Sequence, residues 1–147
     1  MKQAFLRHPE EFSKGTLALA PVASTGSAQN GIAIDTMGYD SVVISTAINV
    51  TGTISAASLV YKIQGADNSA FSSGTIDVVS AVTVDVTTLG TVNPSGVVQL
   101  ALDTTQTPKR YVRAVDMLTI TAAGTGSASG ILAAHGRLFG ADVLPAA

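Results

Sequence analysis

Hydrophobic and polar residues alternate along most of this 147-residue chain. Leu59, Tyr61 and Ile63, for example, alternate with the polar residues Lys62 and Gln64. Because successive side chains of a β-strand point to opposite faces of a sheet, this alternation predicts strands with one buried and one solvated face. The residues that the pattern assigns to the core are Ile32, Ile34, Val42, Ile44, Ile48, Leu59, Tyr61, Ile63, Ile76, Val78, Val82, Val84, Val86, Val98, Leu100, Leu102, Val112, Ala114, Leu118, Ile120, Leu132, Ala134 and Leu138.

Short segments rich in Gly, Ser, Thr, Asn and Pro separate the alternating runs, and their composition predicts turns and loops. These segments are TMGYD (36–40), GADNSAFSSG (65–74), LGTVNPSG (89–96), DTTQTPK (103–109) and AAGTGSASG (122–130). About eight short strands joined by such turns predict an all-β fold, namely an antiparallel sandwich or barrel.

The first 27 residues differ in composition from the rest. They contain three of the eight Lys and Arg residues, both glutamates and two of the four phenylalanines. The segment HPEEFSKG predicts a short helical turn, with Pro9 at its first position and Gly15 as its stop. We therefore divide the chain into an N-terminal arm and linker, residues 1–27, and a β-sandwich domain, residues 28–147.

The charge balance of the chain limits its partners. Only 12% of the residues are charged, and the formal net charge is −2. This argues against binding to nucleic acid, which requires enough Lys and Arg to neutralise several phosphates. The uncharged run 41–61 has the length of a membrane span, but it alternates and contains Asn49 and Gly52, so we interpret it as strands and expect no membrane insertion.

Few residues are suited to catalysis or metal binding. The chain has no cysteine and two histidines, His8 in the arm and His135, which the alternation places on an exposed face. Asp67 and Asn68 lack the alternating acidic pattern of a calcium loop and favour a turn. We therefore predict no enzymatic activity, no metal site and no cofactor. A glycan-binding surface stays open as an alternative, although the chain has no Trp and few other aromatic residues.

Three basic residues gather in the stretch TPKRYVRAVDMLTIT, residues 107–121, and we call Lys109, Arg110 and Arg113 the basic cluster. If the alternation holds, Arg113 projects outward from a strand and Arg110 lies where that strand begins. One interpretation is a solvated strand end with an Arg–Asp pair. The other is that the arginines bind carboxylates of another subunit, since Arg forms bidentate pairs and tolerates burial at interfaces. Asp116 in the same stretch marks a bulge or a charge that needs a partner.

The order of several segments resembles a known family. DTMGYDSVVIS, LVYKIQGADNSAFSSG, KRYVRAV and GILAAHGRLFGA follow one another as in the jelly-roll decoration, or cement, proteins of tailed bacteriophages. The resemblance covers roughly residues 30–140 and rests on the order of these segments. It implies a jelly-roll β-sandwich without enzymatic activity, commonly a homotrimer, that sits between capsomers and clamps the major capsid protein.

We therefore expect a virion protein on the outer surface of a phage capsid, with the major capsid protein and its own copies as partners. Outward-facing apolar residues such as Val43, Val60 and Val97 favour contacts between subunits. The residues predicted to contact other subunits or the shell are Lys2, Phe5, Leu6, Arg7, Phe12 and Lys14 in the arm, and Arg110 and Arg113 in the basic cluster. The alternative function is a glycan-binding module or a tail-associated adhesin with a β-sandwich fold.

Overall fold

The structure is a computed structural model that describes residues 13–24, 26–107 and 109–141. Its strands are β1 (Ser13–Ala23), β2 (Gln29–Asn30), β3 (Ile34–Asp35), β4 (Tyr39–Thr51), β5 (Ile54–Ala66), β6 (Ile76–Asp85), β7 (Ser95–Asp103), β8 (Tyr111–Ala122) and β9 (Ser129–Ala141). Two short 3-10 helices, η2 (Val86–Leu89) and η3 (Thr104–Gln106), precede and follow β7.

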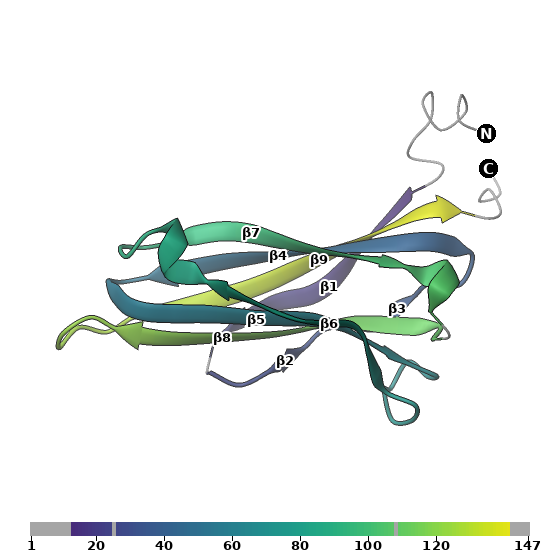
Figure 1. Cartoon of the computed structure of the whole chain (residues 1–147), viewed down its shortest axis with the longest axis horizontal. Coiled ribbons are helices and arrows are strands. Elements are labelled where there is room, and N and C mark those ends of the chain that lie inside the picture. Colours follow the sequence, from purple (N-terminus) through teal and green to yellow (C-terminus); the bar gives the residue numbers. More distant parts are fainter. Residues whose placement is uncertain (1–12, 25, 108, 142–147) are drawn as a thin grey trace, which may run out of the picture.

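The strands form two antiparallel sheets that pack face to face (Figure 1). The first sheet has the order β1-β9-β4-β7, and the second has the order β2-β8-β5-β6, with β3 also paired to β8. When β2 and β3 are counted as one interrupted strand, the eight strands follow the jelly-roll order, in which every connection except β5–β6 crosses from one sheet to the other. The prediction of an all-β, antiparallel, jelly-roll-like sandwich of about eight strands is confirmed.

The core lies between the sheets and follows the predicted alternation in most strands. In β4, for example, Val42, Ile44 and Ile48 are buried. The predicted core residues that are fully buried or nearly so include Ile34, Leu59, Tyr61, Ile63, Val86, Leu102, Val112, Ala114, Leu118, Leu132, Ala134 and Leu138.

The core prediction is wrong for Ile32, Ile76 and Val82, which are exposed. Ile32 lies in the connection between β2 and β3, where its N–H donates to Ala18 O of β1 and the alternation of a regular strand does not apply. Ile76 and Val82 belong to β6, whose register against β5 shifts twice, so strict alternation does not apply along that strand.

The predicted boundary between arm and sandwich is also wrong, because β1 occupies Ser13–Ala23 and pairs with β9. Ala18 and Leu19 of this strand are buried in the core. Its register shifts twice, so the adjacent residues Ala18 and Leu19 are both buried and the alternation is hidden. The end of the predicted helical turn, residues 13–15, is strand, and the rest of that turn lies outside the described residues.

The strand order brings several connections to one end of the sandwich. The register places Ser13 of β1, Asp35 of β3 and Tyr111 of β8 at the same end as the last residue of β9. Figure 1 shows this end on the right, where the described chain begins and ends. The basic cluster lies at the same end, because β8 begins there.

Candidate interaction surface

Two members of the basic cluster precede β8, and each forms an ion pair within the chain. Lys109 Nζ lies 2.7 Å from Asp67 Oδ1 in the β5–β6 loop. Arg110 binds Asp35 of β3 through two bonds, from Nε to Oδ1 at 2.9 Å and from Nη2 to Oδ2 at 2.6 Å. An Arg–Asp pair is therefore present at this strand end, and the contacts of Arg110 with another subunit stay a prediction.

The Arg110–Asp35 pair has a clear electrostatic effect on the carboxylate. The hydrogen bond from Arg110 lowers the pKa of Asp35, and the positive charge of Lys14 acts in the same direction. Lys14 and Arg110, two of the predicted contact residues, are thus brought together near one carboxylate. Both side chains of the ion pair are about half exposed, so solvent screens their attraction.

Arg113 has different partners from the rest of the cluster. Its Nε and Nη2 atoms donate hydrogen bonds to Gln64 Oε1 at 3.3 and 3.0 Å. Its guanidinium carbon lies 4.3 Å from the centre of the Phe71 ring, a distance typical of a cation–π contact. Phe71 has a positive φ of 55°, which is uncommon for a residue other than glycine and turns the β5–β6 loop back toward Arg113.

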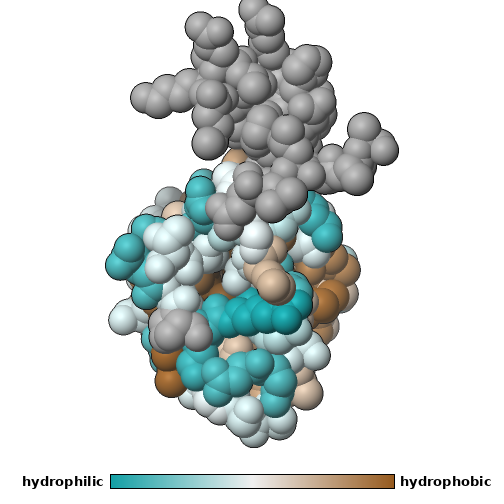
Figure 2. All heavy atoms as spheres, turned by 90° about the vertical axis from the view of Figure 1, so that its right-hand side faces the viewer, coloured by the Kyte–Doolittle hydropathy of each residue, from teal (hydrophilic) through white to brown (hydrophobic). Residues whose placement is uncertain are grey.

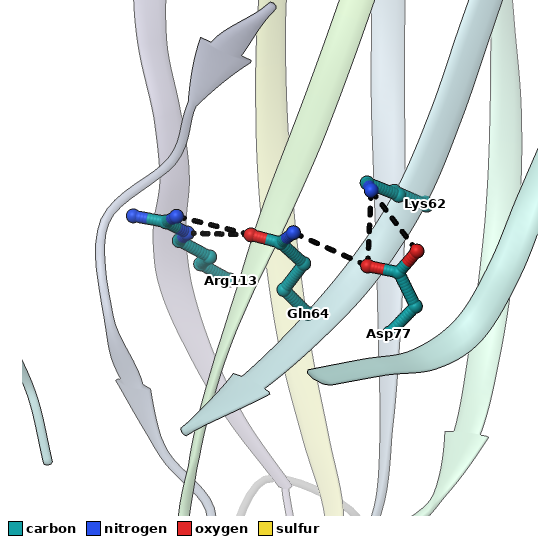
Figure 3. Close-up of polar contacts among 4 residues, drawn as sticks. All are labelled: Lys62, Gln64, Asp77 and Arg113. Carbon is teal, nitrogen blue, oxygen red and sulfur yellow. Dashed lines mark hydrogen bonds and ion pairs between the residues drawn. The ribbon is translucent and has the colours of Figure 1, made fainter. Parts of the chain in front are cut away.

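The contact between Arg113 and Gln64 continues into a row of polar side chains across three strands of the second sheet (Figure 3). Gln64 Nε2 donates to Asp77 Oδ1 at 3.2 Å, and Lys62 Nζ lies 2.9 Å from the same oxygen. The hydrogen bond from Lys62 lowers the pKa of Asp77. We call Lys62, Gln64, Asp77 and Arg113 the polar row.

Asp116 points into the core. It is only 1% exposed and accepts a hydrogen bond from Thr46 Oγ1 at 3.0 Å. Since Asp116 belongs to β8 and Thr46 to β4, this bond joins the two sheets. Burial raises the pKa of Asp116 to about 6. The predicted bulge at Asp116 is wrong, because its pairing with Tyr61 continues without a register shift.

The outer face of the first sheet carries a group of exposed apolar side chains, which lie among polar ones such as Ser45 and Gln99. Val97, Ile131 and Leu17 are exposed to 63%, 52% and 49%. The register places small residues beside them, since Ala47 pairs with both Ala133 and Val97. We call the following residues the apolar face: Leu17, Ala47, Val97, Ala101, Ile131 and Ala133.

His135 and Arg137 interrupt the apolar face on β9. His135 is exposed, as the sequence predicts. Arg137 lies 5.8 Å from the centre of the Phe139 ring and donates a hydrogen bond from Nη2 to Ser13 Oγ at 3.1 Å. The face therefore combines exposed apolar and small side chains with few charges.

The end of the sandwich where the described chain begins and ends differs from the apolar face in its side chains. Figure 2, which looks onto the end where the described chain begins and ends, shows hydrophilic side chains across the middle and hydrophobic ones at the sides. The ion pairs of Lys109 and Arg110 belong to this end. Of the eight predicted contact residues, the structure describes three, and Lys2, Phe5, Leu6, Arg7 and Phe12 lie outside the described residues.

The sequence prediction did not include four residues that bind the basic cluster, namely Asp35, Gln64, Asp67 and Phe71. Asp35 and Asp67 are separated from their basic partners by 75 and 42 positions. Only the strand register, which places Gln64 opposite Arg113, would have identified such pairs. The composition of the loop around Phe71 predicts a turn but not its direction.

Within the described ranges, no three His, Cys, Asp or Glu residues lie close enough together to hold a metal ion. In the same part of the chain, no helix is long and apolar enough to cross a membrane.

Comparison with protein families gives no match, and no curated protein matches the sequence. Several solved structures share a remote likeness. The VP2 subviral particle of infectious bursal disease virus is 12% identical over 88% of this chain, with a TM-score of 0.49. This chain spans about a third of the VP2 chain, since the match covers 32% of it.

Two further structures share a likeness of the same kind. The SPBc2 prophage-derived protein YomS is 8% identical, with a TM-score of 0.44, and the match covers 86% of this chain and 91% of YomS. The PBSX exported protein XepA is 14% identical, with a TM-score of 0.42, and the match covers 91% of this chain and 39% of XepA. The fold assignment rests on the strand order described above and not on these likenesses.

Proposed function

We propose that this chain is a non-enzymatic structural protein of a bacteriophage virion. It decorates the outer surface of the capsid as a homotrimer and stabilises the shell by clamping neighbouring subunits of the major capsid protein. The family resemblance of its ordered sequence segments suggests this role, and the jelly-roll strand order is compatible with it. The observation that carries the proposal is the apolar face of the first sheet.

The apolar face has the properties of a protein-binding surface. Val97, Ile131 and Leu17 each expose about half or more of their surface to water. Burying such side chains stabilises a complex by roughly 25 cal/mol for each Å² of apolar area removed from water. Interface centres are also depleted in charged residues, and the six residues of the apolar face include none, although Arg137 and Asp103 lie on the same side of the sheet. We therefore place the shell contact on the first sheet.

The basic cluster and the arm supply the remaining contacts of the proposal. Arg110 uses Nε and Nη2 for Asp35, and its side chain is half exposed. A guanidinium in this setting has further donors for a carboxylate of another subunit. Lys14 lies near the same place. The proposal assigns to both residues, and to the arm, contacts with the capsid or with neighbouring copies.

One observation favours the alternative, a glycan-binding or tail-associated adhesin module. The polar row presents an amide, a carboxylate and two cationic side chains in a line next to Phe71. Sugars are bound by such hydrogen-bonding groups beside an aromatic ring. In this structure the polar groups of the row are bonded to one another, so a sugar would have to displace contacts within the chain.

Binding to shells separates the two functions. Purified protein is added to phage shells that lack decoration, and the bound copies are counted by electron microscopy; the same protein is applied to a glycan array. The expected result is saturable shell binding, abolished by Ile131→Glu on the apolar face and unaffected by Val82→Glu on the second sheet. Val82 is a matched control, because it is also an exposed apolar strand residue. Glycan binding without shell binding would overturn the proposal.

A further inference from the structure

The outer edges of a β-sandwich expose backbone N–H and C=O groups that can pair with another chain, and proteins usually block them. The first sheet ends in β1 and β7. β1 contains Pro21, which has no N–H to donate, and its register against β9 shifts twice. These features make the β1 edge a poor partner for another strand.

Both edges of the second sheet are also poor partners for an added strand. On one side, β2 and β3 have two residues each, too few to support an added strand. On the other side, the register of β6 against β5 shifts twice, and such bulges twist an edge away from partners.

β7 has none of these features. Its pairing with β4 runs through nine consecutive residue pairs without a register shift. The strand SGVVQLALD contains no Pro, Lys or Arg, and its single charge, Asp103, is its last residue. Within the described part of the chain, β7 pairs only with β4, so its other edge has no strand partner. β7 is therefore the edge of this sandwich that is suited to strand addition.

We propose that β7 pairs with β7 of a second copy of this chain, antiparallel and centred on Gln99. The two first sheets would join into one continuous sheet of eight strands. This contact does not use the arm or the basic cluster, so it adds a two-fold contact to the proposed function without depending on it. Copies or trimers that meet across a two-fold axis would be linked through it.

The residues of β7 are complementary in this register. Pairing about Gln99 places Val97 opposite Ala101 of the second copy on the outer face, and it places Val98 opposite Leu100 on the inner face. Val98 and Leu100 are only partly buried in one copy, and each would cover the other. Asp103 falls opposite Ser95, so the two aspartates do not face each other. A slip by one residue would place inward and outward side chains opposite each other and lose this match.

Cysteine cross-linking tests the register directly, because the chain has no cysteine of its own. In Gln99→Cys, the two introduced thiols face each other at the centre of the proposed contact, so a short bismaleimide should link most of the protein into dimers. The matched control is Ala81→Cys, an exposed position on the β6 edge. The expected result is a linked dimer for Gln99→Cys and little linkage for Ala81→Cys. Equal linkage of both variants, or none for Gln99→Cys, would refute the proposal.

Charge exchange provides a second, independent test. The double variant Val97→Lys/Ala101→Lys puts two pairs of like charges across the contact, and Val97→Glu/Ala101→Glu does the same with acidic groups. Each variant alone should self-associate through this contact with an affinity at least about tenfold lower, measured by sedimentation. A mixture of the two variants should form the heterodimer, because opposite charges then face each other. Both positions are exposed, so the melts should match that of the wild type. Failure of the mixture to associate, with both variants folded, would contradict the proposed register.

Discussion

At the scale of single residues, Asp116 is the described side chain whose ionisation bears most directly on folding. It lies in the core, where its neighbours are apolar and Thr46 supplies its hydrogen bond. Burial raises its pKa from 3.8 to about 6, so the folded chain holds this proton more tightly than the unfolded chain does. The resulting stabilisation is complete below pH 3.8 and is lost as the pH rises through about 6.

We therefore expect the free energy of unfolding to decrease as the pH rises from 4 to 8, with Asp116 contributing up to about 3 kcal/mol of this loss. Asp116→Asn should remove this component, because an amide does not ionise. Denaturant unfolding of both proteins at several pH values measures the difference. Asp35 and Asp77, whose pKa values are lowered, affect stability with the opposite sign and at lower pH. Parallel pH profiles for the wild type and Asp116→Asn would contradict this assignment.

Thr46→Val tests the same site from the other sheet. The hydrogen bond from Thr46 lowers the pKa of Asp116 and so opposes the effect of burial. Without the hydroxyl group, the pKa of Asp116 should rise further and the loss of stability should shift to higher pH. An unchanged midpoint in the pH profile would show that the hydrogen bond does not act on the carboxyl group as described.

Arg113 contacts Gln64 and Phe71 of its own chain, so its substitution affects folding stability as well as binding. Its cation–π contact with Phe71 should contribute about 0.5–1 kcal/mol. A double-mutant cycle with Arg113→Ala and Phe71→Ala should therefore give a coupling of this size in the free energy of unfolding. A coupling of zero would mean that the contact contributes nothing. We also predict that Arg113→Glu weakens attachment to the shell more than it weakens folding, which the copy number on shells and the melt of the free variant measure.

At the scale of secondary structure, the sequence predicts strands well where a strand is long and where its pairing runs without a register shift. β4, β8 and β9 are long and pair without interruption along most of their length, so their alternation is visible. β6 is an edge strand with two register shifts, and its apolar residues do not share one face. β1 shows no clear alternation in the sequence, because its own register shifts bury adjacent residues. Bulges depend on the pairing partner, which a single sequence does not specify.

The candidate surfaces were predicted less completely than the strands, for a related reason. Alternation is enough to show that Arg113 and His135 face outward. The partners of Arg113 depend on the β5–β8 register and on the direction of a loop, and both are set by tertiary structure. Likewise, the apolar face forms only when β4, β7 and β9 lie side by side.

Truncation distinguishes the arm from the first strand. Removal of residues 1–12 deletes no residue of the described strands, so the sandwich should still fold and melt cooperatively. Removal of residues 1–23 also deletes β1, which would expose the edge of β9 and take Ala18 and Leu19 from the core. Losing a buried Leu alone costs about 2–5 kcal/mol, a large part of the stability of a typical domain. The longer deletion should therefore be unfolded or aggregated by circular dichroism, and a normal melt would show that β1 is dispensable.

At the scale of the whole molecule, the first sheet presents two features suited to association, an apolar face and an open β7 edge. The second sheet has blocked edges and the polar row on its outer face. This asymmetry suggests that the first sheet mediates most contacts with other subunits. The proposed trimer and the proposed two-fold contact both predict that the isolated protein is more stable when it is more concentrated.

Because association stabilises the folded state by mass action, the melting temperature should rise by several degrees over a 100-fold increase in protein concentration. Light scattering at each concentration gives the oligomeric state. The double variant Val97→Lys/Ala101→Lys then identifies the contact responsible. If it removes the concentration dependence, β7 pairing is the main association in solution; if trimers persist, the arm or the basic cluster holds them together. A constant melting temperature with a monomer throughout would mean that neither contact forms in solution, and the trimer would then have to assemble on the shell.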